Sequence, residues 1–167
     1  MNEEFEQIAE IFQRHGADFM VIGGQAELLH GSSRVTYDVD FCYRRTPENL
    51  VRVVAALKEL QPTLRGAPKD LPFILDERTL AMGTNFTFDT ELMPLDLLGY
   101  VEPFGGFETL EARGVVFRSG ELRLLTISLD DLLAIKKHVN RAKDQESIIQ
   151  LTALVARREQ GKTARRD

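Results

Sequence analysis

The chain has 167 residues, a net charge of −5 and 43% hydrophobic residues. This length and composition are typical of one globular domain with a hydrophobic core. No apolar run reaches the roughly 20 residues that a membrane span needs. The acidic start, residues 1–16, differs from the basic and apolar regions of a signal peptide. We therefore expect a cytoplasmic protein without membrane contact.

The charge is unevenly distributed along the chain. Residues 157–167 carry five basic and two acidic side chains, a net +3 that leaves −8 on the rest. An acidic body lacks the broad basic surface that is expected of a nucleic-acid-binding domain. We expect one domain over residues 1–160 and a disordered basic tail over 161–167. The tail could contact RNA or a partner, but a solvated terminus is the simpler interpretation.

In the first third of the chain, apolar spacing predicts helices and strands in alternation. The expected elements are a helix over 3–15, a strand over 19–22, a tight turn at Gly23-Gly24, a short helix over 25–30 and a strand over 36–43. Thr46 then suits an N-cap and Pro47 the first position of the next helix.

Residues 61–72 hold three prolines and several charges, which predicts a loop. The expected elements after it are strands over 85–89 and 91–98, a hairpin of 115–117 and 122–125, and helices over 128–139 and 143–158. This order predicts an α+β (α/β) domain, with a mixed sheet of about five strands flanked by helices.

An aspartate pair in the strand 36–43 is the feature that points to chemistry. Asp38 and Asp40 are one residue apart, and thirteen residues separate Asp38 from Gly24. Alternate residues of a strand project to one face, so the two carboxylates would lie side by side and repel each other unless a cation lies between them. The nearby glycines would let the backbone approach a phosphate closely.

Asp96 is the third candidate carboxylate. It stands between Leu95 and Leu97, where a charged residue is unexpected on a buried strand. If its strand pairs beside the strand of Asp38 and Asp40, all three acids share one face. Three carboxylate donors suit Mg²⁺ or Mn²⁺, which bridge to substrate phosphates.

These residues resemble the signature of the nucleotidyltransferase superfamily related to DNA polymerase β. The resemblance rests on an apolar strand, Gly23-Gly24, the Asp38-Val-Asp40 motif and Asp96, and it covers residues 19–98. The run from Arg34 to Asp40 is most similar to bacterial stand-alone members. These are the toxin-type enzymes of abortive-infection and toxin–antitoxin systems and the antibiotic-modifying nucleotidyltransferases. The segments 132–137 and 141–144 are more loosely similar to the toxin type.

The resemblance implies a nucleotidyltransferase fold and a role for each residue. Asp38, Asp40 and Asp96 would hold two divalent metals, and Asp96 would also help to deprotonate the attacking hydroxyl. Gly23 and Gly24 would cradle the triphosphate through backbone N–H groups. Many members have a serine after the first glycine, and its hydroxyl contacts phosphate. With Gly24 at this position only backbone donors are present, and toxin-type members often have the same Gly-Gly pair.

Two cationic residues keep two interpretations each. Arg34 could bind phosphate or lie in a solvated loop. Lys136 could neutralise the β- and γ-phosphates or extend along a helix surface. Both are candidate nucleotide ligands.

The expected activity is the transfer of a nucleotide from a nucleoside triphosphate to a hydroxyl acceptor, with release of pyrophosphate. The acceptor could be RNA, a protein side chain or a small molecule, and a toxin–antitoxin role is one interpretation. A second copy of the chain or a cognate partner protein could complete the substrate pocket. The alternative is a catalytically inactive member that acts as a binding or regulatory subunit.

Overall fold

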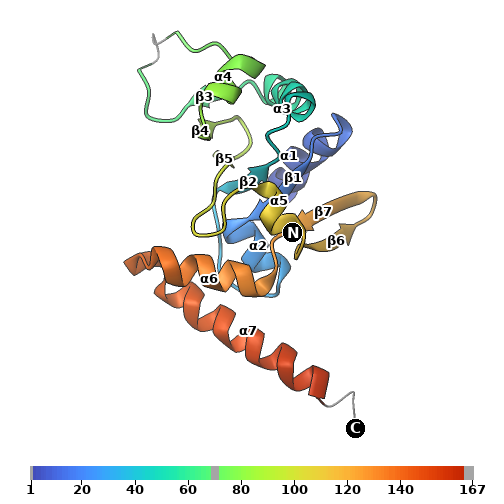
Figure 1. Cartoon of the computed structure of the whole chain (residues 1–167), viewed down its shortest axis with the longest axis vertical. Coiled ribbons are helices and arrows are strands. Elements are labelled where there is room, and N and C mark those ends of the chain that lie inside the picture. The colour runs from blue at the N-terminus through green and yellow to red at the C-terminus, as the bar shows by residue number, and fades with distance from the viewer. Residues whose placement is uncertain (1, 69–71, 164–167) are drawn as a thin grey trace.

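The computed structural model describes residues 2–68 and 72–163. These residues form a mixed sheet flanked by helices (Figure 1), as expected for the α+β class. In chain order the elements are α1 (Glu3–Arg14), β1 (Phe19–Ile22), α2 (Gly23–Leu29), β2 (Val39–Tyr43), α3 (Pro47–Leu60), β3 (Thr63–Leu64), α4 (Glu77–Met82), β4 (Asn85–Asp89), β5 (Leu95–Leu98), α5 (Phe107–Glu111), β6 (Val115–Ser119), β7 (Leu122–Thr126), α6 (Leu129–Val139), the 3₁₀ turn η1 (Ala142–Asp144) and α7 (Gln145–Thr163).

The sheet has seven strands in the order β3-β4-β5-β2-β1-β7-β6. β2 pairs with β5 in parallel at the centre, and β1 pairs with β2 antiparallel. In this register Asp40 is the direct partner of Asp96 on β5 and of Ile22 on β1. The topology therefore places the two strands that carry the predicted acids next to each other, as the sequence indicated.

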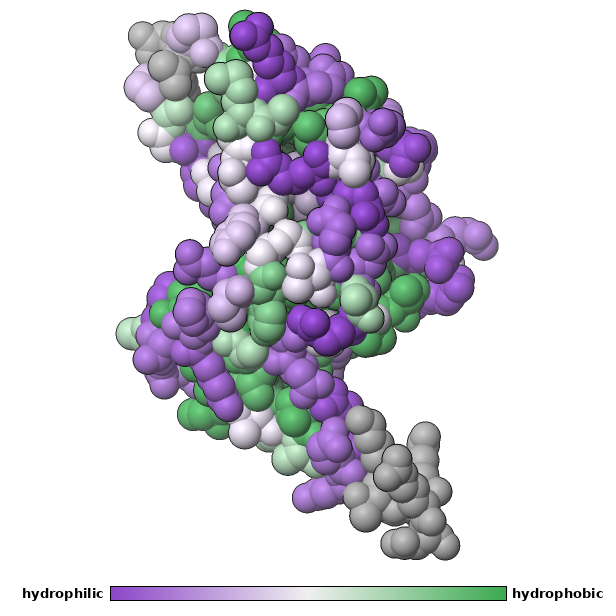
Figure 2. Space-filling view, in the orientation of Figure 1, coloured by the Kyte–Doolittle hydropathy of each residue, from purple (hydrophilic) through white to green (hydrophobic). Residues whose placement is uncertain are grey.

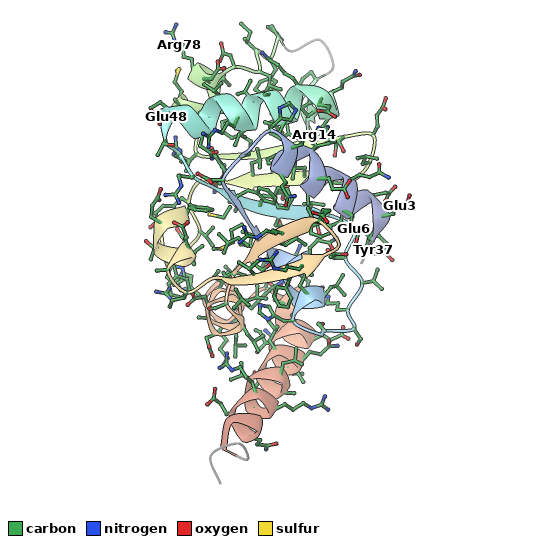
Figure 3. All side chains as sticks on the ribbon, turned by 90° about the vertical axis from the view of Figure 1, so that its right-hand side faces the viewer. Glu3, Glu6, Arg14, Tyr37, Glu48 and Arg78 are labelled. Carbon is green, nitrogen blue, oxygen red and sulfur yellow. The ribbon has the colours of Figure 1, made fainter. Side chains whose placement is uncertain are left out.

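Helices cover both faces of the sheet. On one face α1 contacts α3; on the other α2 contacts α6, which in turn contacts α7. Figure 3 shows α1 and α3 above the sheet and α6 and α7 below it, with α7 extending away from the body. None of the helices in the described part of the chain is long and apolar enough to cross a membrane.

A cluster of phenylalanines fixes the central strands against α1. Phe19 of β1 and Phe41 of β2 have ring centroids 4.5 Å apart, and Phe12 of α1 lies 5.2 Å from Phe41 with the rings edge to face. All three side chains are buried. This packing fixes alternate side chains of β2 in the core, so that Asp40 projects from the opposite face.

Polar caps fix where the helices begin. The predicted cap at Thr46 is confirmed, because its side chain accepts a hydrogen bond from the N–H of Asn49. Ser128 caps α6 in the same way, with a bond of 3.2 Å from the N–H of Asp131.

Over the exterior, hydrophilic and hydrophobic residues are interspersed in the face that Figure 2 shows.

Several elements differ from the prediction: among them, β5 is shorter than the predicted 91–98, and the short helices α4 and α5 were not predicted. β2 begins at Val39, so Asp38 lies just before the strand, and α2 begins at Gly23, so both glycines belong to its first turn. The sheet has seven strands in place of about five, partly because the predicted loop 61–72 contains β3, which has only two residues. The last helix, α7, continues to Thr163 and so includes the first residues of the predicted tail, whereas residues 164–167 lie outside the described residues.

Candidate active site

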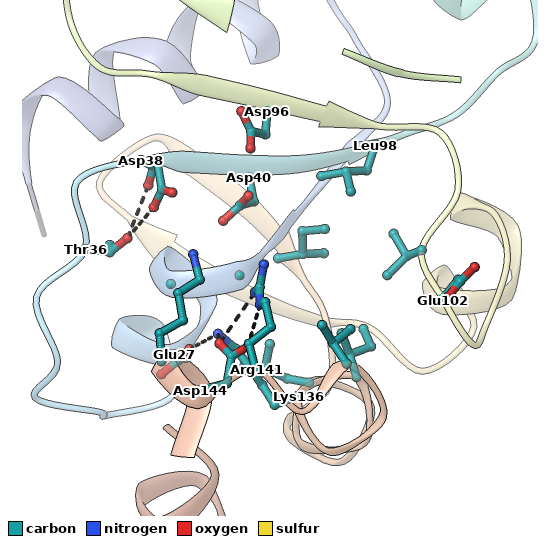
Figure 4. Close-up of a pocket in the computed structure, with 18 of the residues that line it drawn as sticks. Glu27, Thr36, Asp38, Asp40, Asp96, Leu98, Glu102, Lys136, Arg141 and Asp144 are labelled. Atoms are coloured by element: carbon teal, nitrogen blue, oxygen red, sulfur yellow. Dashed lines mark hydrogen bonds and ion pairs between the residues drawn. The ribbon is translucent and has the colours of Figure 1, made fainter. Parts of the chain in front are cut away.

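One cleft of about 460 Å³ lies between the sheet and α6. Its wall includes all seven residues that the sequence singled out: Gly23, Gly24, Arg34, Asp38, Asp40, Asp96 and Lys136. Figure 4 shows the three aspartates on one side of this cleft and Lys136 on the other, with Arg141 between them. The fold thus brings residues from four separate segments to one place. Their chemical roles stay predictions.

Gly23 and Gly24 pack directly against the acid-bearing segment. Gly23 has a positive φ of 61°, and a Cβ at this position would lie 1.9 Å from the Oδ2 atom of Asp40. A Cβ on Gly24 would lie 2.4 Å from the hydroxyl oxygen of Thr36. No other residue type fits at either position without displacing these neighbours. The glycine pair therefore lets the backbone approach the carboxylate of Asp40, to which the N–H of Gly24 donates a hydrogen bond.

Asp40 is partly buried at the centre of this arrangement. Burial raises the pKa of Asp40 to about 7, and the negative charges of Asp38 and Asp96 add to the rise. Lys136 and the N–H of Gly24 oppose it. A carboxylate with this environment is poorly compensated by the protein itself, and its ionised form would be stabilised by a bound cation.

The outer two carboxylates have partners within the protein. The hydroxyl of Thr36 donates to Oδ1 of Asp38 at 2.7 Å. Arg65, which follows β3, lies with Nη1 2.9 Å from Oδ1 of Asp96 and also pairs with Asp89 through Nε at 3.0 Å. Burial raises the pKa of Asp96, and Arg65 opposes that rise.

As these side chains lie, residues 2–68 and 72–163 contain no group of three or more His, Cys, Asp or Glu side chains arranged to hold a metal ion. The predicted metal set is therefore gathered in one cleft but not converged on one point. The chemistry of the set still fits a hard divalent cation, because three carboxylates line the same cleft and Gly23 lets the backbone pack against one of them.

Lys136 is held by two buried carboxylates. Its Nζ atom lies 2.9 Å from Oε1 of Glu27 on α2 and 3.0 Å from Oδ1 of Asp144 in η1, and both acids are only 1% exposed. Arg141 pairs with the other oxygen of Asp144 at 2.7 Å. Burial by itself would raise the pKa of Asp144, but the hydrogen bonds from Arg141 and Lys136 outweigh it and lower the pKa to about 2. Lys136 is thus an ion-paired residue of the cleft wall and does not extend along the helix surface.

Arg34 is bonded on the side of the cleft near α7. Its guanidinium donates to the hydroxyl of Ser147, and its backbone N–H donates to the hydroxyl of Ser32 at 3.2 Å. The loop that carries Arg34 is therefore tied to α7 and is not simply solvated.

Sequence reasoning missed four residues of this site as functional candidates: Glu27, Arg65, Arg141 and Asp144. For Glu27 a signal existed, because it lies one helical turn after Gly24 and so shares its face of α2. No local pattern marks Arg65, since it reaches Asp96 only through the pairing of β3, β4 and β5.

At the sequence level, neither a protein-family profile nor a curated protein matches the chain. Solved structures do match. The lincosamide antibiotic adenylyltransferase LnuA, with lincomycin bound, has a TM-score of 0.63 and 15% identity, over 92% of this chain and 98% of LnuA. A Thermotoga maritima protein described as a candidate nucleotidyltransferase has a TM-score of 0.56 and 11% identity, over 89% of each chain.

A third similar structure is the antibiotic-resistance factor ANT(2'')-Ia, with a TM-score of 0.55 and 13% identity, over 96% of this chain and 92% of that one. The chain has the nucleotidyltransferase fold. The expected fold relationship is therefore confirmed over nearly the whole described chain. At these identities the likeness concerns the fold alone, so the reaction has to be argued from the residues in the cleft.

Proposed function

We propose that this protein transfers a nucleotide from a nucleoside triphosphate to a hydroxyl acceptor and releases pyrophosphate, with Mg²⁺ or Mn²⁺ as cofactor. One observation carries the proposal: Asp40 is partly buried beside two other carboxylates, and its own carboxylate packs against Gly23, where a side chain would collide with it. A module that only bound a partner would gain nothing from three mutually repelling acids. The nucleotidyltransferase fold supports the same interpretation.

Each residue of the cleft has a task in this reaction. Backbone N–H groups at Gly23 and Gly24 would bind the triphosphate, and Lys136, Arg141 and Arg34 would offset its negative charge. Divalent cations held by Asp38, Asp40 and Asp96 would stabilise charge on the α-phosphate and on the leaving oxygen. Asp96 would accept the proton of the acceptor hydroxyl. The hydroxyl oxygen then bonds to the α-phosphorus as the bond to the bridging oxygen breaks and pyrophosphate leaves.

For the acceptor we infer a small polar molecule. Two of the similar structures, the lincosamide adenylyltransferase LnuA and the antibiotic-resistance factor ANT(2'')-Ia, are matched along almost their full lengths. The acidic charge of the chain, −5, also disfavours unaided contact with RNA.

The test follows the label of an α-³²P nucleoside triphosphate. The purified protein is incubated with each of the four labelled triphosphates, Mg²⁺ and a cell extract, and the products are separated into small molecules, RNA and protein. We expect metal-dependent transfer of label to a small molecule. Transfer to RNA or protein would instead support the toxin role, with or without a cognate partner protein.

Two variants make this test specific. Asp40→Asn keeps the shape of the side chain but loses a carboxylate, so transfer should fall by a factor of about 100 or more. Glu91→Gln removes a charge from an exposed residue outside the cleft and should leave transfer unchanged. Pyrophosphate release that survives in Asp40→Asn would refute the mechanism. No transfer and no pyrophosphate release with any of the four triphosphates would favour an inactive binding or regulatory subunit.

A further inference from the structure

The cleft has a second, apolar end that the proposed chemistry leaves unused. Beyond Asp96, the strand β5 ends at Leu98, and Tyr100 follows after Gly99. α6 forms the opposite wall. The apolar lining of this end includes Leu98, Tyr100, Leu132, Ile135 and Val139. Figure 4 shows Leu98 and Glu102 on the side of the cleft away from Thr36 and Asp38.

Two of these lining residues are well exposed. Tyr100 is 49% exposed and Val139, at the end of α6, is 43% exposed. Exposed apolar surface on both walls of a concave site is typical of a place where a flat or apolar ligand binds.

The backbone of Tyr100 is fixed by Asn85 of β4. Oδ1 of Asn85 accepts hydrogen bonds from the N–H groups of Gly99 and Tyr100, at 3.0 and 3.2 Å, and Nδ2 donates to the carbonyl of Tyr100 at 3.3 Å. The side chain of Asn85 is thereby occupied, and it holds the aromatic residue in place at the rim of the cleft. A backbone fixed before the ligand arrives leaves only the side-chain torsions of Tyr100 to be ordered on binding.

We propose that the apolar end is the nucleobase subsite, with Tyr100 as the residue on which the base stacks. The inference rests on the proposed function, which places the triphosphate at Gly23-Gly24 and the α-phosphate at the aspartates. The nucleoside then has to leave the carboxylates along the same cleft. Toward Thr36 and Arg34 the wall is mostly polar, and toward Leu98 it is mainly apolar and aromatic, with Asn85 and Glu102 as its polar members (Figure 4). An aromatic face stacks on any base, because every base has a π-face.

The competing occupant is an apolar part of the acceptor. Both would contact Tyr100, but only a base subsite makes the affinity for free nucleoside triphosphate depend on the ring. Inorganic tripolyphosphate distinguishes the phosphate contribution to the affinity from the base contribution, because it carries the phosphates and lacks the base.

The experiment measures the Kd of Mg²⁺–nucleoside triphosphate and of Mg²⁺–tripolyphosphate by isothermal titration calorimetry, for the wild type and three variants. Tyr100→Ala should weaken nucleotide binding roughly 5- to 150-fold and leave tripolyphosphate unchanged. Tyr100→Phe keeps the ring and should bind like the wild type. The matched control is Tyr37→Ala, because Tyr37 is 79% exposed, is labelled in Figure 3 and does not line the cleft.

The outcomes separate this inference from the function on which it rests. Nucleotide affinity that is equal in Tyr100→Ala and the wild type overturns the base subsite alone, and a raised KM for the acceptor in that variant assigns the ring to the acceptor instead. The base subsite is also overturned if the wild-type protein binds nucleotide no more tightly than tripolyphosphate. Wild-type protein that binds neither ligand overturns the base subsite and the proposed function together.

Discussion

Among single residues, Asp40 has an environment that is unfavourable for its own charge. The side chain is partly buried, two further carboxylates lie close by, and the compensating groups are Lys136 and one backbone N–H. In an unfolded chain the same carboxyl would titrate near its ordinary pKa of 3.8. The difference between these two pKa values makes the stability of the fold depend on pH.

Replacing Asp40 by asparagine should stabilise the protein at neutral and alkaline pH. Because the folded pKa of Asp40, about 7, is above 3.8, the wild type loses stability as the pH rises from about 4 to 7. The asparagine side chain does not titrate, so the gain in Tm should grow over this window and then stay constant. Three pKa units correspond to at most about 4 kcal/mol. Thermal unfolding of both proteins from pH 4 to 9 measures this gain in Tm.

Glu91→Gln is the control for this pH series, because Glu91 is exposed. Saturating Mg²⁺ should raise the Tm of the wild type at pH 8 and leave that of Asp40→Asn nearly unchanged. A Tm difference that is the same at pH 4 and pH 8 would contradict the assigned environment of Asp40.

Among the elements, the junction of β1 and α2 is the part of the fold most tightly adapted to the cleft. Ile22, the last residue of β1, pairs with Asp40, and Gly23 directly after it begins α2 with a left-handed φ. The sequence predicted the glycine turn but not that the helix would begin within it. A glycine such as Gly23 is typical of a turn, so the sequence alone does not show that a helix begins there. The contact with Asp40 shows why glycine is needed at this position.

Gly23→Ala should destabilise the protein more than Gly120→Ala. Gly120, in the β6–β7 turn, has a similar φ of 56°, and its Cβ would meet no atom within 4 Å. The control should therefore cost only the left-handed strain, about 1–2 kcal/mol, whereas Gly23→Ala adds a collision with Asp40 of about 1–3 kcal/mol more. Urea unfolding of both variants gives the comparison, and equal losses would refute the close packing. Nucleotide affinity should fall in Gly23→Ala only.

At the scale of the whole molecule, one buried ion-pair cluster joins the sheet-bound helix α2 to the C-terminal helices. Lys136 of α6 contacts Glu27 of α2 and Asp144 of η1, and Arg141 contacts the same Asp144. This cluster forms the side of the cleft that faces the aspartates. The packing of this wall of the cleft therefore depends on the same ion pairs that join α2 to the C-terminal helices.

Asp144→Asn should destabilise the protein by about 2–3 kcal/mol at pH 7. The folded pKa of Asp144, about 2, is below 3.8, so its contribution is complete above pH 4 and is lost as the pH falls through about 2. The Tm difference from the wild type should narrow over that acid range. The control is Asp130→Asn, which breaks the exposed pair of Asp130 with Arg158 and should cost at most about 1 kcal/mol. Equal losses would refute the special role of the buried cluster.

The sequence predicted most of this architecture, and its failures have physical causes. Periodicity and caps identified the long elements, such as α3 after Thr46 and α6 after Ser128. β3, with two residues, has too few side chains to show a period, and it exists through its pairing with β4. The candidate residues line one cleft. The ion-pair partners of Asp96 and Lys136 could not be predicted, because they come from segments distant in sequence.

The parallel pairing of β2 with β5 has a consequence for how the molecule matures. Asp40 and Asp96 become neighbours only when the whole segment 41–95 has closed into a loop, and contacts of such long range are slow to form. A chain that emerges from the ribosome has the glycine pair and Asp40 early, but it lacks the third carboxylate until β5 has been made and docked. Under the proposed function, partly folded molecules would therefore be unable to transfer a nucleotide, and the site would be complete only once the central sheet has formed.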